Sequence, residues 1–175
     1  MTRSRSVTFL ASVAALPLAV LALAGCGGSG SSSAPPAPPK TKDGRLATVG
    51  IANEGLGKIL VNSRARTLYL FQKDSGTMSA CTGACAVNWP PLRDSGSPLV
   101  GSGVNASLLG TTTRSDGKPQ ITYNGHPLYL FVKDRKPGDT NGEGVTAFGG
   151  SWFAVSPTGN QVSAQAPSPG NGYGY

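Results

Sequence analysis

The chain has 175 residues and a formal net charge of +7, and its basic residues are scattered along the sequence. Proteins that bind nucleic acids gather lysine and arginine on one face, so this distribution argues against a nucleic-acid partner. Glycine and proline number 25 and 14, and no long apolar pattern recurs at helical spacing, which together argue against a helix bundle.

The N-terminus, residues 1–25, has the layout of a secretory signal, in which basic residues precede an apolar run. Arg3 and Arg5 stand before the apolar run Val7–Ala24, and Cys26 follows shortly after it. The sequence Leu-Ala-Gly-Cys that ends at Cys26 resembles the lipobox of bacterial lipoproteins, and this resemblance implies cleavage before Cys26 and acyl chains on that residue. Two or three acyl chains hold a protein firmly at a membrane, so we expect an extracytoplasmic protein anchored by lipid. The alternative is a single membrane-spanning helix, for which the run is barely long enough.

Two segments have compositions that cannot bury a core. Residues 26–45 begin with the cysteine expected to be lipidated and continue rich in glycine and serine and then in proline, which predicts a disordered tether. Residues 164–175 are again rich in proline, glycine and serine and are predicted to form a disordered tail. The region between them, 46–163, has a normal size for one domain.

One seven-residue stretch occurs twice in this region. Residues 68–74 read LYLFQKD and residues 128–134 read LYLFVKD, so the two copies differ at one position. We interpret them as the same strand in two related units, of about residues 46–100 and 115–160. Leucines alternate with aromatic residues in both copies, which predicts a strand that is apolar on both faces.

Turn residues and short apolar runs predict a hairpin in each unit, with the repeated stretch as its second strand. Asn124-Gly125 is a residue pair that a type I′ turn favours. Trp89 and Trp152 follow the two copies, and we expect each to pack against the aromatic residues of its own copy. The fold class is therefore predicted to be all-β, a small antiparallel sandwich or barrel-like domain made of two related units. The other expected strands are 48–52, 58–61 and 120–123, and 105–109 is a candidate short helix.

A motif of the form Tyr-x-aromatic-x-x-Asp occurs in both copies. Its residues are Tyr69, Phe71 and Asp74 in the first copy and Tyr129, Phe131 and Asp134 in the second. With this motif the chain resembles the secreted-repeat lipoproteins, a bacterial family known for it. The resemblance covers Leu46–Val155 and includes the Cys-x-x-x-Cys stretch before Trp89 and the Pro-Gly-Asp step at 137–139. It implies an envelope location and a two-unit architecture, and it implies no reaction.

Cys81 and Cys85 are the pair that remains once Cys26 carries lipid. Outside the cytoplasm a disulfide between them would persist and would tighten their loop. Two thiolates together with His126, the only histidine, would instead suit copper or zinc. Copper chaperones of the Sco type also use Cys-x-x-x-Cys and one histidine, although the match ends at the cysteines. The sequence leaves a structural disulfide and a metal or thiol-redox site as alternatives.

Acidic residues raise two further hypotheses. Asp74 and Asp134 follow the two copies, where a carboxylate can cap a loop by accepting backbone N–H groups. The same two residues could act as an acid–base pair if both lay on one face. Asp139, Asn141 and Glu143 alternate in a glycine-containing loop, a pattern that suggests calcium although the spacing is not that of an EF-hand.

Sequence arrangements typical of enzymes are absent. The chain contains no Gly-x-Ser-x-Gly elbow, no His-Glu-x-x-His and no phosphate-binding glycine loop followed by Lys-Ser or Lys-Thr. We therefore expect a binding or interaction module for an unknown envelope ligand or protein, in which exposed aromatic rings would form the binding surface. The alternative function is metal or thiol-redox chemistry on the cysteine pair.

Overall fold

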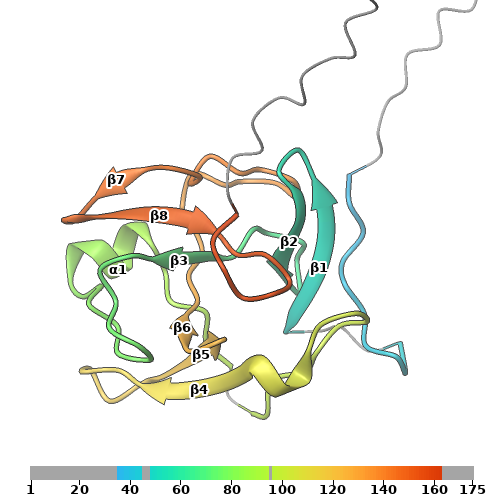
Figure 1. Cartoon of the computed structure of the whole chain (residues 1–175), viewed down its shortest axis with the longest axis horizontal. Helices are drawn as coiled ribbons and strands as arrows, with labels where there is room; N and C mark the ends of the chain where they lie inside the picture. The colour runs from blue at the N-terminus through green and yellow to red at the C-terminus, as the bar shows by residue number, and fades with distance from the viewer. Residues whose placement is uncertain (1–34, 45–47, 95, 163–175) are drawn as a thin grey trace, which may run out of the picture. The chain divides into compact units, whose positions relative to one another are not determined.

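The computed structural model describes residues 35–44, 48–94 and 96–162. The predicted signal peptide, Cys26 with its predicted lipid, and the predicted C-terminal tail lie outside these residues. Within the described ranges, no helix is long and apolar enough to cross a membrane. The elements are β1 (Val49–Glu54), β2 (Gly57–Asn62), β3 (Tyr69–Phe71), α1 (Ala84–Asn88), the 3-10 helix η1 (Ala106–Leu108), β4 (Leu109–Thr113), β5 (Pro119–Tyr123), β6 (His126–Pro127), β7 (Thr146–Ala147) and β8 (Gly150–Ala154) (Figure 1).

The strands form three small antiparallel sheets, which confirms the predicted all-β class. One sheet pairs β1 with β2, a second has the order β3-β8-β7, and a third has the order β4-β5-β6. The two-residue turn predicted between β5 and β6 is present, and its residues Asn124 and Gly125 have φ values of 50° and 79°. Both φ values are positive, as a type I′ turn requires.

Both copies of the repeated stretch extend the hairpin of their own unit. The Leu68 N–H donates to the Leu60 carbonyl at 3.0 Å in the first unit. The Leu128 N–H donates to the Ile121 carbonyl at 2.9 Å in the second. The β1–β2 and β4–β5 hairpins are therefore corresponding parts of the two units.

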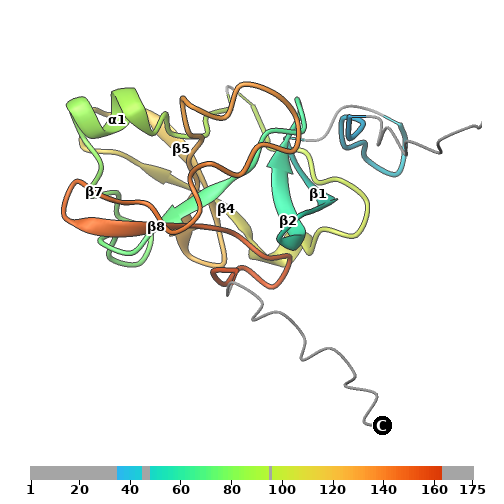
Figure 2. The ribbon, with the colours of Figure 1, turned by 90° about the horizontal axis from the view of Figure 1, so that it is seen from above.

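The segment that carries each tryptophan pairs with the repeated stretch of the other unit. β3 of the first unit pairs with β8 of the second, and Figures 1 and 2 both show these strands side by side. The Gln72 N–H donates to the Ser151 carbonyl at 3.0 Å, and the corresponding Val132 N–H donates to the Asn88 carbonyl at 3.1 Å. The two units thus exchange their closing segments, whereas the sequence analysis expected each unit to be closed by its own tryptophan segment.

The two faces of the repeated strand enter different parts of the core, as predicted. Tyr69 and Phe71 belong to an aromatic cluster, whereas Leu68 and Leu70 belong to a largely aliphatic one. All four side chains are at most 5% exposed. Both faces of this strand are therefore buried in the core.

Four rings are stacked in a column through the aromatic cluster. Phe131, Trp89, Trp152 and Phe71 follow one another with centroid separations of 4.1, 3.9 and 4.0 Å. Each tryptophan meets the tyrosine of its own unit edge-on, at 5.4 and 5.1 Å, but stacks on the phenylalanine of the other unit. The expected packing is therefore right for the tyrosines and wrong for the phenylalanines, because the closing segments are exchanged.

The end of the predicted tether packs on the domain. Pro39 lies so close to Gly50 in β1 that a Cβ at Gly50 would clash with it. The Ser102 N–H donates to the Lys40 carbonyl at 2.9 Å. Residues 35–44 thus differ from the disordered tether that the composition of 26–45 predicts.

Candidate functional site

The tyrosines and aspartates of the repeated motif form two crossed pairs. The Tyr69 hydroxyl donates to Asp134 at 2.7 Å, and the Tyr129 hydroxyl donates to Asp74 at 2.8 Å, so each aspartate holds the tyrosine of the other unit. The second oxygen of each aspartate accepts a backbone N–H from the loop that follows its own repeat, at 2.8 and 2.9 Å. Within the described residues no hydrogen bond joins the two carboxyl groups. Their contacts are those of loop caps and inter-unit ties, and not those of an acid–base pair.

Burial determines the protonation of both pairs. Burial raises the pKa of Asp74 and that of Asp134 above the usual carboxyl range. Burial also raises the pKa of Tyr69 and of Tyr129 well above the ordinary tyrosine value, so both phenols keep the proton that they donate.

The raised pKa of Asp134 predicts a pH-dependent contribution to stability. The folded chain binds this proton more tightly than the unfolded chain, so the contribution is present at low pH and is lost as the pH rises from about 4 through the raised pKa. We expect the free energy of unfolding of Asp134→Asn, measured by urea at several pH values, to fall less than that of the wild type as the pH rises from about 4 to 7. Asp116→Asn is the control, because the pKa of Asp116 is lowered and its contribution has the opposite sign. Parallel pH profiles for Asp134→Asn and the wild type would contradict the assignment.

Cys81 and Cys85 are joined by a disulfide, which confirms one of the two alternatives. Their Cα atoms are 5.2 Å apart and both side chains are buried. Bonded sulfurs provide no thiolate for copper or zinc. His126 lines a separate pocket, and the described part of the chain contains no group of three His, Cys, Asp or Glu residues that could hold a metal. The predicted metal site on the cysteines and His126 is therefore not supported.

The three residues suggested for calcium form hydrogen bonds with different parts of the protein. Asp139 accepts the N–H groups at positions 135 and 136 at 2.8 and 3.1 Å, and Glu143 accepts the Ala154 N–H at 2.7 Å. The Asn141 side-chain amide donates to Asp134 at 3.2 Å. These contacts hold the loop together and tie it to β8, so they give no support to calcium ligation.

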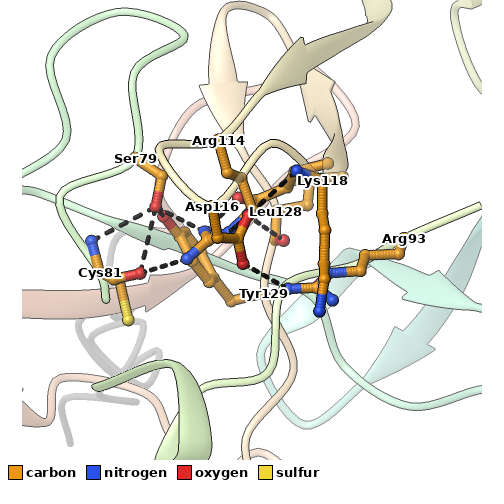
Figure 3. Close-up of polar contacts among 9 residues, drawn as sticks. Ser79, Cys81, Arg93, Arg114, Asp116, Lys118, Leu128 and Tyr129 are labelled. Atoms are coloured by element: carbon orange, nitrogen blue, oxygen red, sulfur yellow. Dashed lines mark hydrogen bonds and ion pairs between the residues drawn. The ribbon is translucent and has the colours of Figure 1, made fainter. Parts of the chain in front are cut away.

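Arg114 is the centre of a buried polar network that the sequence analysis missed (Figure 3). It is 5% exposed, and its guanidinium donates to Ser79, to Gln120 and to the Cys81 carbonyl at 2.7, 2.6 and 2.6 Å. Its Nε lies 3.6 Å from Asp116. Arg114 therefore ties the disulfide loop of the first unit to the β4–β5 hairpin of the second.

Asp116 connects this network to a second arginine, Arg93. The Arg93 guanidinium lies 3.3 Å from the Asp116 carboxylate, and Figure 3 shows the contacts running from Cys81 through Arg114 to Arg93. The Lys118 backbone N–H, followed by the charges of Arg114 and Arg93, holds the pKa of Asp116 below its usual range. Asp116 therefore stays ionised and orients Arg93 at the surface.

Arg93 lines a pocket of about 640 Å³ together with Arg64. We call it the arginine pocket, and its apolar lining includes Leu92, Leu99 and Leu130. The site thus places two guanidinium groups beside an apolar surface. No spacing motif connects these residues, because the fold gathers them from three separate segments.

The local chain positions Arg64 through a turn. The Asn62 side chain accepts the backbone N–H groups of Arg64 and Arg66, both at 2.9 Å, and Ala65 in the same turn has a φ of 55°. Asp94, which also lines the arginine pocket, accepts the Thr48 hydroxyl at 2.6 Å. The one acidic side chain of the pocket is therefore already engaged by a protein donor.

A pocket of about 290 Å³ at the other copy of the repeat offers an internal comparison. We call it the histidine pocket. It is lined by Leu70, which corresponds to Leu130, and by His126, which corresponds to Arg66, two residues before the first copy of the repeat. The histidine pocket contains Asp74 and no arginine. The two pockets thus share one corresponding leucine and differ in the charged side chains that line them.

Comparison with known proteins gives one match. A family model described as a secreted repeat of unknown function matches residues 50–93 and 110–156, which together make just over half of the chain. Each matched segment contains one copy of the repeated stretch and one of the two tryptophans. No curated protein and no solved structure matches the chain.

Proposed function

The chain belongs to the family of secreted repeats of unknown function, and we propose that it is a binding module held in the cell envelope by lipid on Cys26. The secreted family supports an extracytoplasmic location. The apolar run that ends at a lipobox-like Cys26 supports the anchor.

The aromatic residues expected to form a binding surface do not provide it. The tyrosine and phenylalanine of each copy of the repeated stretch, together with Trp89 and Trp152, are at most 6% exposed, because they make the core. A ligand must therefore bind elsewhere on the domain.

The arginine pocket is the observation that carries the proposed function. Arg64 and Arg93 offer forked donors that fit a phosphate or carboxylate, and Leu99 and Leu130 offer apolar contact beside them. Binding sites generally combine an apolar lining with a few convergent polar groups. The ligand class that fits is a small amphiphile with an anionic head and an apolar chain.

Hexyl phosphate is a suitable probe for this pocket. We expect it to bind the protein and to perturb the NMR signals of Leu99 and Leu130, whereas inorganic phosphate and hexanol, which each lack one half of the ligand, bind more weakly. Arg64→Gln combined with Arg93→Gln should weaken hexyl phosphate binding by about tenfold or more, because charge-assisted hydrogen bonds are lost.

Lys58→Gln is the control, since it removes an exposed cation that does not line the arginine pocket. Its affinity for hexyl phosphate should equal that of the wild type. Equal binding by the double variant, or equal binding of hexanol and hexyl phosphate, would show that the arginine pocket is not an anion site.

A further inference from the structure

The last part of the spacer is docked along β1. Pro39 covers Gly50, Lys40 accepts the Ser102 N–H at 2.9 Å, and Figures 1 and 2 show this blue segment beside β1. At its start, Pro36 reaches the 133–138 loop, since a Cβ at Gly138 would lie 3.8 Å from the Pro36 Cγ. We call residues 36–40 the docked spacer.

Docking shortens the link to the proposed lipid anchor. An extended chain spans at most about 3.3–3.6 Å per residue, so the stretch from Cys26 to Pro36 can reach no more than about 35 Å. If the whole spacer up to Thr48 were free, its maximum reach would be about 75 Å. If Cys26 carries the proposed anchor, the docked spacer limits how far the domain can move from the membrane, and its Pro36 end is the end nearest to Cys26 along the chain.

The loop that Pro36 reaches is basic and exposed. Lys133, Arg135 and Lys136 are all exposed, and within the described residues none of the three forms a salt bridge. The two acids of the same loop are engaged: Asp134 is fully buried against Tyr69, and Asp139 accepts backbone N–H groups. The corresponding loop of the first unit carries a single cation, Lys73.

We propose that Lys133, Arg135 and Lys136, the basic loop, bind anionic lipid headgroups, and that the docked spacer holds this loop toward the membrane. Basic side chains close to an anionic leaflet are attracted to it, and the attraction adds up over neighbouring cations. The orientation rests on the proposed lipid anchor. The binding of headgroups does not rest on that anchor, because it depends on the basic loop alone.

The headgroup binding can be measured without lipid on the protein. The unit that begins at Ala34 is compact by itself, so a chain of residues 27–175 retains the described domain. We expect this chain to bind phosphatidylcholine vesicles that contain phosphatidylglycerol and not vesicles of phosphatidylcholine alone. Replacing the three basic-loop cations by glutamine should weaken binding by about tenfold or more, whereas Lys73→Gln should leave it unchanged. Equal binding by the triple variant and the wild type would overturn the proposal.

The docked spacer is tested on the lipidated full-length protein. Gly50→Ala places a methyl group where Pro39 lies and should release the spacer, and Pro39→Gly should release it without altering β1. Energy transfer from a domain label to a bilayer dye should fall in both variants. Unchanged transfer in both would overturn the docking, whereas no transfer in the wild type would instead mean that the lipid anchor is absent. In that case the vesicle binding of the 27–175 chain still decides the headgroup proposal.

Discussion

Trp152→Ala is expected to lower the free energy of unfolding by about 3–5 kcal/mol, the range found when a buried tryptophan is truncated. Trp152 is fully buried and stacks on Phe71 at 4.0 Å and on Trp89 at 3.9 Å, while Tyr129 meets it edge-on. Alanine would leave a cavity between two rings that belong to different elements. Because the column joins both units, the loss should appear as one cooperative transition at lower urea concentration.

Two variants serve as controls for this measurement. Trp89→Ala removes the corresponding ring of the other unit. It should lower the free energy of unfolding by a similar amount, since Trp89 also lies inside the column. Phe148→Ala removes a ring that is 42% exposed and should cost little, as surface substitutions usually do. If Trp152→Ala cost no more than Phe148→Ala, the column would not be the core of this domain.

Arg114→Met should lower the free energy of unfolding by about 2–4 kcal/mol, although it places an apolar side chain at a buried position. Gln120 and the Cys81 carbonyl would each lose a charged donor at 2.6 Å, and Ser79 would lose one at 2.7 Å. A buried polar group without a partner costs about 1–3 kcal/mol. Asp116 is half-exposed and can be solvated, so it adds little to the cost.

Arg93→Met is the matched control, because Arg93 pairs with the same Asp116 from an exposed position. Exposed ion pairs contribute about 0–1 kcal/mol, so this variant should keep nearly the wild-type free energy of unfolding. Both values can be obtained by urea denaturation at neutral pH with the disulfide intact. Equal costs for the two substitutions would mean that the buried network around Arg114 does not stabilise the fold.

The local elements of this fold were predictable from the sequence. The alternation of leucine and aromatic residues correctly placed one face of the strand in each part of the core, and Asn124-Gly125 correctly predicted the hairpin turn. These features depend on neighbouring residues, and the sequence pattern describes them directly. The short helix α1 was missed, because five residues are too few to show a helical period.

The exchange of closing segments was not predictable in the same way. Both copies of the repeat present nearly the same side chains, so Trp152 could satisfy either copy equally well by composition. Which copy it meets depends on the path of the connecting chain and on the pairing of β3 with β8. Register between distant strands is specified by the whole packed core and not by a local motif.

The candidate site depends even more strongly on tertiary structure. Arg64 and Arg93 have no motif in common, and they meet only because the turn after β2 lies beside the segment that follows Trp89. The docked spacer had one sequence signal, a glycine inside β1 at position 50, where a side chain would block Pro39. In the loop with Asp139, Asn141 and Glu143, the carboxylates of Asp139 and Glu143 accept backbone N–H groups, a role that oxygen-rich loops can have as readily as calcium binding.

The central claim is that the motif residues of both units form one shared core, and a double-mutant cycle between Trp89 and Trp152 tests it most directly. Leucine is the replacement of choice, because it removes the stacked rings and leaves less of a cavity than alanine. The shared core predicts a coupling free energy of about 0.5–1.5 kcal/mol between the two positions, as expected for stacked aromatic partners. Additive costs, with no coupling beyond the error of the two single variants, would mean that the two units fold around separate cores.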